Sequence, residues 1–96
     1  MANLDNIMDY LADEQDRFLL LSANSPSGTT AGRIITNSSY HGKYMIVGFA
    51  MQTSGNWYET ISAVEYISVQ SDGIWMKLNT AAWGSLPTKL LLYKYA

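Results

Sequence analysis

The sequence predicts a mainly β domain, an antiparallel, jelly-roll-like β-sandwich of about six to seven strands that follows one short N-terminal α-helix. From residue 17 onward, apolar runs are separated by turn-forming residues at intervals of roughly 8 to 12 positions, a spacing typical of sandwiches and barrels. Before residue 17, apolar residues recur instead at helical spacing. Because 96 residues leave room for one domain, we divide the chain into a helix over 1–16 and a sandwich head over 17–96.

The predicted helix carries one apolar stripe. Asn3 is a suitable N-cap residue, and the stripe follows it at spacings of three and four. A helix of about 13 residues is marginal in water on its own, so its stripe needs a partner surface. That partner is either the β body of the same chain or, as we expect, the same stripe of a second subunit in a short coiled-coil seam. The predicted oligomer interface consists of Leu4, Ile7, Met8 and Leu11.

Composition and charge limit the possible partners. The chain is 48% hydrophobic and only 15% charged, against about 25% charged in typical soluble domains, which we interpret as apolar surface covered by further copies. Residues 1–16 hold five acidic and no basic residues, whereas residues 17–96 hold six basic against three acidic residues, a formal charge of +3. That positive charge is too dilute for a nucleic-acid-binding patch, so no nucleic-acid partner is expected.

The chain contains no cysteine, which excludes a disulfide framework, thiolate metal sites and cysteine nucleophiles. Its N-terminus lacks a signal-peptide pattern, and no apolar run approaches the roughly 18 residues of a membrane span. We therefore expect a protein made in the bacterial cytoplasm without a signal peptide and without membrane insertion.

The apolar patterns predict strands over 17–23, 33–36, 43–52, 58–69, 74–80 and 89–95. Strand 43–52 has Met45, Val47, Phe49 and Met51 on one predicted face and is apolar on the other face too. Such a strand is central and covered on both sides, or its outer face lies in a subunit interface. Gly48 marks a position suited to a β-bulge.

The second half of the chain shows two further features, a predicted bulge and a predicted hairpin. The apolar alternation in strand 58–69 changes phase, which predicts a bulge near residues 63–65. Ser71-Asp72-Gly73 predicts a tight hairpin between the strands on either side.

Few residues could carry catalysis. His41 is the only histidine, and no neighbouring acid and nucleophile accompany it. On a continuous strand, Glu59 and Glu65 are about 20 Å apart, beyond the roughly 5 to 9.5 Å of a glycosidase pair. The acidic stripe of the predicted helix lacks the loop that wraps calcium. We expect no catalytic residue, no cofactor, no metal site and no enzyme activity.

Aromatic residues beside turns offer a different chemistry. Loop tryptophans and tyrosines present an apolar face and a polar edge, which suits stacking on sugar rings or anchoring an interface. The alternative is that these aromatic residues complete the small core or a subunit contact. The candidate ligand-binding residues are Trp57, Tyr58, Trp83, Tyr40 and His41, with Trp57 and Trp83 the better candidates.

Several stretches of the chain resemble the short tail-fibre or receptor-binding proteins of phages that infect gut Firmicutes. The resemblance rests on the opening Met1-Ala2-Asn3-Leu4-Asp5-Asn6-Ile7-Met8-Asp9-Tyr10-Leu11-Ala12, on Leu19-Leu20-Leu21, on Tyr44-Met45-Ile46-Val47-Gly48-Phe49 and on Lys89-Leu90-Leu91-Leu92-Tyr93-Lys94-Tyr95. It implies a β-sandwich head at the tip of a phage tail or fibre, usually a homotrimer, that adheres to host surface glycan. The family has no fixed ligand residues to carry over.

Two functions therefore stay open. The first is a receptor-binding module for host adhesion, a homo-oligomer, with a trimer favoured, that presents loop aromatics to carbohydrate. The second is a purely architectural structural protein of a virion or particle, with no ligand of its own, which contacts its own copies and other tail or particle proteins. If the protein is phage-encoded, the virion tail is its expected location.

Overall fold

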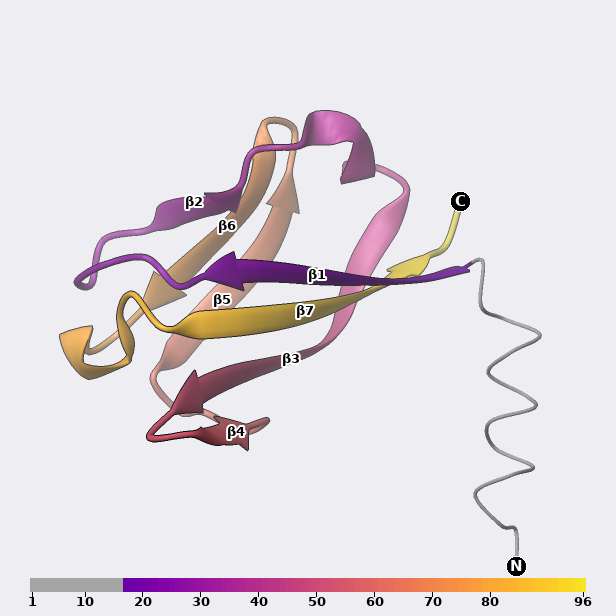
Figure 1. Ribbon diagram of the computed structural model, residues 1–96. Helices are drawn as coiled ribbons and strands as arrows, with labels where there is room; N and C mark the ends of the chain where they lie inside the picture. Colours follow the sequence, from indigo (N-terminus) through magenta and orange to yellow (C-terminus); the bar gives the residue numbers. More distant parts are fainter. Residues whose placement is uncertain (1–16) are drawn as a thin grey trace, which may run out of the picture.

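The computed structural model describes residues 17–96 (Figure 1). The predicted helix over 1–16 and its interface residues Leu4, Ile7, Met8 and Leu11 lie outside the described residues. Residues 17–96 contain no helix that is long and apolar enough to cross a lipid bilayer.

The described chain is mainly β and forms two antiparallel sheets, as the sequence predicts. Sheet A has the strand order β1-β7-β3-β4, and sheet B has the order β2-β6-β5. The strands are β1 (Phe18–Asn24), β2 (Gly32–Ile35), β3 (Tyr44–Thr53), β4 (Asn56–Tyr58), β5 (Val64–Gln70), β6 (Gly73–Leu78) and β7 (Pro87–Lys94). Two short 3-10 turns, η2 (Ser38–Tyr40) and η3 (Ala81–Trp83), lie in the connections.

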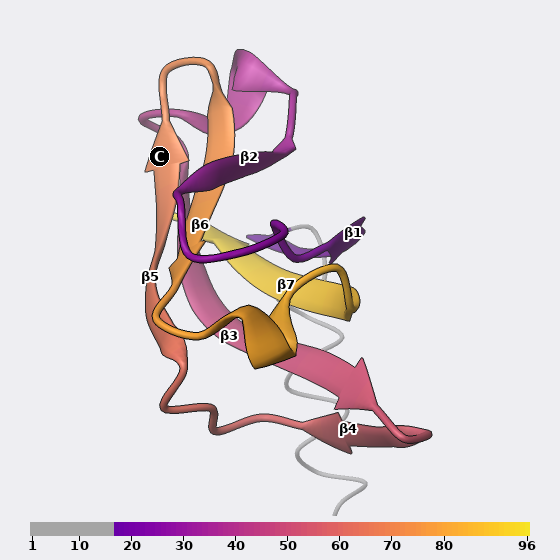
Figure 2. The ribbon, with the colours of Figure 1, turned by 90° about the vertical axis from the view of Figure 1, so that its left-hand side faces the viewer.

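The two sheets face each other across an apolar layer (Figure 2). The middle strand of sheet B and the second strand of sheet A supply most of its fully buried side chains. These are Ile74, Met76 and Leu78 from β6, and Leu90 and Leu92 from β7. The strict alternation of β6 is the pattern predicted for a half-buried strand, and it is confirmed.

Strand β3 contains the bulge expected at Gly48, and the bulge changes which residues face the core. The register with β7 shifts between Ile46 and Gly48. Ile46 before the bulge and Phe49 after it both pack toward the core, while Met45 and Val47 are each 47% exposed. The predicted grouping of Met45 and Val47 with Phe49 and Met51 is therefore wrong, because one extra residue reverses the alternation.

The predicted continuous strand 58–69 is also wrong. Strand β4 ends at Tyr58 in sheet A, and β5 begins at Val64 in sheet B. Between them the chain turns so that Ile61 and Ala63 enter the core, at 8% and 5% exposure. A register shift between Val64 and Tyr66 does match the predicted bulge.

Candidate functional site

The five predicted ligand residues lie in three separate places. Tyr58 of β4 and Trp83 of η3 form one pair, edge to face, with ring centroids 5.8 Å apart. Trp83 is half-buried and packs against the core cluster around Met51 and Met76. Trp83 therefore extends the core at its edge, while Tyr58, which is 42% exposed, keeps part of its ring open to solvent.

Trp83 is held in place by Ser25, a nearly buried polar residue from the loop after β1. The Ser25 hydroxyl donates to the Trp83 carbonyl oxygen at 2.7 Å and accepts from the Leu86 N–H at 3.0 Å. The Ser25 backbone N–H also donates to the Leu86 carbonyl oxygen at 3.0 Å. These bonds join two loops that lie about sixty residues apart in the sequence.

Trp57 points to the other side of β4 from Tyr58, because successive strand residues alternate in direction. The Lys89 ammonium lies 4.5 Å from the centre of its indole ring, a cation–π geometry. Trp57 is therefore oriented by a residue of β7, the second strand away in sheet A, and it points to the other side of the sheet from the Tyr58–Trp83 pair.

Tyr40 and His41 lie at the opposite end of the molecule from η3 (Figure 1). Tyr40 packs edge to face on Tyr44, with ring centroids 5.4 Å apart, and against the core cluster around Leu92. His41 follows it on an exposed turn. These two residues are separated from the other predicted ligand residues.

A surface that the aromatic pattern did not indicate lies on sheet A, on the side away from the core. We call it the outer face of sheet A. In β1 and β7 the outward residues pair across the strands, as Leu20 with Leu91 and Phe18 with Tyr93, while Leu19 and Leu21 alternate with them toward the core. The exposed large apolar residues on this face are Leu20 (61%), Met45 (47%), Val47 (47%) and Trp57 (39%).

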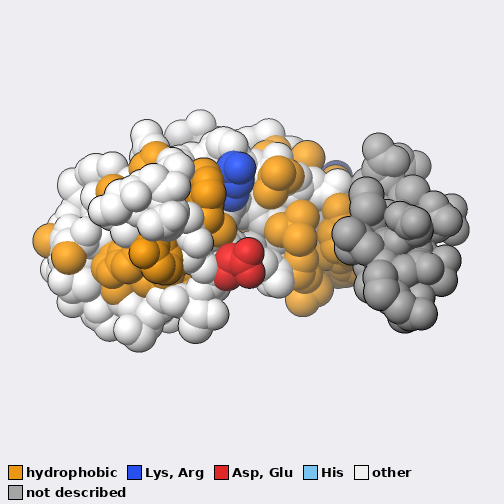
Figure 3. All heavy atoms as spheres, turned by 60° about the horizontal axis from the view of Figure 1, so that its bottom comes forward, with side chains coloured by type: hydrophobic (Ala, Val, Ile, Leu, Met, Phe, Trp, Pro, Cys, Tyr) orange, Lys and Arg blue, Asp and Glu red, His pale blue; other side chains and the backbone are white. Residues whose placement is uncertain are grey.

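This face contains an open groove of about 720 Å³. Its apolar lining comes from β1, β3 and β7 and includes Leu20, Val47 and Leu91, and its polar lining includes Glu59 and Lys89. Figure 3, which brings the bottom of Figure 1 forward, shows hydrophobic side chains gathered on both sides of acidic and basic ones. An apolar floor with a few charged groups beside it suits a protein segment, or a sugar ring laid flat.

The break between β4 and β5 also changes the geometry of Glu59 and Glu65. Both line a second groove of about 410 Å³ between β3 and β5, so the 20 Å separation expected on one continuous strand does not apply. Both residues are exposed, and the Glu65 carboxylate accepts a hydrogen bond from Lys77 at 2.6 Å. Within residues 17–96, no group of His, Cys, Asp and Glu is placed to hold a metal ion.

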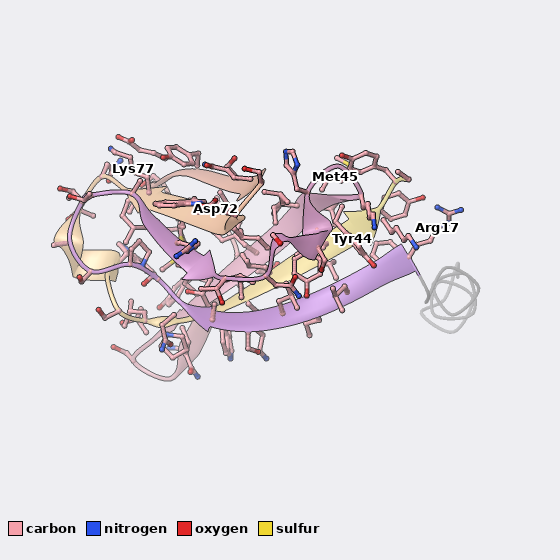
Figure 4. All side chains as sticks on the ribbon, turned by 90° about the horizontal axis from the view of Figure 1, so that it is seen from above. Arg17, Tyr44, Met45, Asp72 and Lys77 are labelled. Carbon is pink, nitrogen blue, oxygen red and sulfur yellow. The ribbon has the colours of Figure 1, made fainter. Side chains whose placement is uncertain are left out.

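The outer side of sheet B has a different character (Figure 4). The Asp72 carboxylate accepts from the Trp75 indole N–H at 2.8 Å and forms an ion pair with Arg33 at 3.4 Å. Lys77 and Glu65 form a second ion pair on the same side. Apart from Tyr66, which is 41% exposed, the outer side of sheet B therefore carries polar and charged groups that satisfy one another.

The sequence did contain a signal for the outer face of sheet A. Leu19-Leu20-Leu21 and Leu90-Leu91-Leu92 are runs of three leucines within strands, and strand alternation must turn the middle leucine of each run outward. What the runs could not show is that β1, β7 and β3 lie side by side, which brings their outward residues together. No protein-family model, no curated protein and no solved structure matches this chain.

Proposed function

We propose that the protein is a non-catalytic, architectural subunit of a homo-oligomer and that the outer face of sheet A is its assembly surface. The observation that carries the proposal is the row of outward apolar side chains across sheet A, exposed in β1, β3 and β4 and half-buried in β7, opposite a sheet B whose outer side carries two ion pairs. Contiguous exposed apolar surface of this kind is typical of protein–protein interfaces.

The strand pairing supports a jelly-roll-like sandwich within this proposal. Strand β1 pairs with β7 in sheet A and β2 pairs with β6 in sheet B, so the first two strands of the described chain pair with its last two. Jelly rolls are built by this nesting of antiparallel strands and are common in viral capsid proteins. A place in a phage tail or particle, as the resemblance implies, belongs to the same proposal.

The assembly surface is tested by two matched substitutions on opposite sheets. Val47→Glu puts a charge on the outer face of sheet A, and Tyr66→Glu puts the same charge on sheet B at similar exposure, 47% against 41%. We expect Val47→Glu to lower the mass measured by light scattering after size exclusion, because a buried unpaired carboxylate strongly disfavours an interface. Tyr66→Glu should leave the mass unchanged. Equal masses for the parent and both variants would contradict the proposal.

Adhesion to host surface carbohydrate is the second candidate, favoured by the surroundings of Trp57. Its partly exposed ring is held by Lys89, and Lys89, Glu59 and Thr60 line the neighbouring groove with hydrogen-bonding groups. An aromatic ring beside polar groups is the arrangement that stacks on a sugar and hydrogen-bonds its hydroxyls.

A glycan array separates this candidate from pure architecture. We expect a bound bacterial polysaccharide to be lost with Trp57→Ala and kept with Tyr95→Ala, which removes another exposed aromatic ring near the C-terminus. Binding that survives Trp57→Ala would exclude this site. An array without any bound polysaccharide would leave the architectural function alone.

A further inference from the structure

The two sheets together have four edge strands, β1 and β4 in sheet A and β2 and β5 in sheet B. An edge strand has one row of backbone N–H and C=O groups that no neighbouring strand satisfies. Natural edge strands are therefore short, bulged or charged, which prevents pairing with another chain.

Three of the four edges carry such protection. Strand β4 is only three residues long. Strand β2 has four residues, contains Arg33 and shifts its register between Arg33 and Ile35. Strand β5 shifts its register between Val64 and Tyr66, and the charged Glu65 lies between them.

Strand β1 carries none of these features. Its seven residues, Phe18–Asn24, include no charge, no proline and no glycine, and they pair with β7 without a register shift. Its first four residues are all apolar, and Leu20 is 61% exposed. In Figures 1 and 4, β2 lies beside only the Asn24 end of β1, so the Phe18 end of the edge is clear of sheet B.

We propose that β1 pairs antiparallel with β1 of a second copy of this chain across a two-fold axis. The pairing joins two four-stranded sheets into one continuous sheet of eight strands and places the outer faces of both sheets A side by side. It rests on the proposed function, in which the protein is a homo-oligomer, and it adds the strand that joins the copies. Between the two paired copies it stands in place of the coiled-coil seam expected from Leu4, Ile7, Met8 and Leu11, because their segments leave from opposite ends of the joined strands. A two-fold contact is self-complementary and needs one surface only, and uncharged β1 offers a second β1 no like charge.

The charge of the N-terminal sequence favours the antiparallel direction. Residues 1–16 carry five acidic residues and no basic one, and only Arg17 separates them from β1. Parallel pairing would bring two such segments to the same end of the joined strands. Antiparallel pairing along all seven residues makes them leave from opposite ends of the strand, about 20 Å apart at roughly 3.4 Å per residue. That distance exceeds the Debye length of about 8 Å at physiological ionic strength.

Amide hydrogen exchange, measured by NMR on the full chain at concentrations where it is oligomeric, tests the pairing without any substitution. In a free edge strand, only alternate N–H groups donate to the neighbouring strand, and the others exchange quickly. In the part of β1 that lies clear of β2, we expect the amides that point away from β7 to be protected. They should exchange at least about 100-fold more slowly than the amides of β5 that point away from β6. Outward β1 amides that exchange as fast as those of β5 would overturn the pairing.

Crosslinking gives an independent test, because the chain has no cysteine of its own. Leu20→Cys and Ser22→Cys place thiols on β1, and Ser68→Cys places one on the β5 edge as a control. Opposite residues in an antiparallel pair have Cβ atoms about 5 Å apart, within reach of a short bismaleimide. We expect a crosslinked dimer from the β1 variants, alone or mixed, and none from Ser68→Cys.

The outcomes separate the pairing from the function on which it rests. An oligomer without β1 crosslinks, or an oligomer of three chains, overturns the two-fold pairing and leaves the proposed assembly function intact. A single chain at every concentration overturns both.

Discussion

At the scale of single residues, Ser25 shows how this small domain holds its connections together. The residue is 4% exposed, and its side chain and backbone together bond to Trp83, Ser85 and Leu86. No buried side-chain nitrogen or oxygen within residues 17–96 is left without a hydrogen-bond partner. Separating the two loops would leave buried donors and acceptors without partners, which costs free energy. Ser25 therefore holds the loop after β1 against the loop before β7.

Ser25→Ala removes the hydroxyl that serves both loops. The Leu86 N–H and the Trp83 carbonyl oxygen then lose a partner in a half-buried place, so we expect the free energy of unfolding to fall by about 2 kcal/mol. Urea denaturation followed by circular dichroism measures the change. Ser27→Ala, at an exposed position of the same loop, should change stability by less than about 0.5 kcal/mol. Equal effects at the two positions would contradict this role of Ser25.

At the scale of elements, the sequence predicted most strands but not how each one is used. Strand β6 was predictable, because its buried residues alternate cleanly with Trp75 and Lys77. Strand β3 was not, because both of its faces are apolar and either phase of the alternation looks acceptable until the bulge is placed. The turn at 59–63 was missed for a related reason, since Ile61 and Ala63 are as apolar in a buried connection as they would be in a strand.

The candidate site was less predictable than the strands. Trp57 and Lys89 lie more than thirty residues apart in the sequence, and only the neighbouring positions of β4, β3 and β7 bring them together. No local pattern contains that information. Of the predicted ligand residues, Trp57, Tyr58 and His41 are exposed while Tyr40 and Trp83 are half-buried, and the fold distributes them over three places.

In sheet B, removing a buried side chain should lower the free energy of unfolding more than breaking an exposed ion pair does. Met76 has no exposed surface, so Met76→Ala leaves a cavity in the core and should lower the free energy of unfolding by about 3 kcal/mol. The Glu65–Lys77 pair on the outer side of the same sheet is one-third to one-half exposed. Water screens such a pair, so Glu65→Gln should cost less than about 1 kcal/mol. Chemical denaturation ranks the two variants, and a larger loss from Glu65→Gln would contradict the ranking.

At the scale of the whole molecule, the two sheets have different outer sides. Sheet B presents two ion pairs, Arg33–Asp72 and Lys77–Glu65, beside the exposed Tyr66. Sheet A presents leucine, valine, methionine and tryptophan beside a groove, and one of its edges is the unprotected strand β1. A chain of 96 residues buries a smaller share of its surface on folding than a larger domain does. Covering the outer face of sheet A with another copy would complete that burial, which is why we place assembly at the centre of the function.

The mass of the 96-residue chain in solution tests this account most directly. Sedimentation equilibrium at increasing concentrations across the micromolar range requires neither a ligand nor a substitution. We expect a mass that rises to a multiple of the 10.7 kDa chain, with two chains as the unit if β1 pairs across a two-fold axis. A constant mass of 10.7 kDa over the whole range would contradict it.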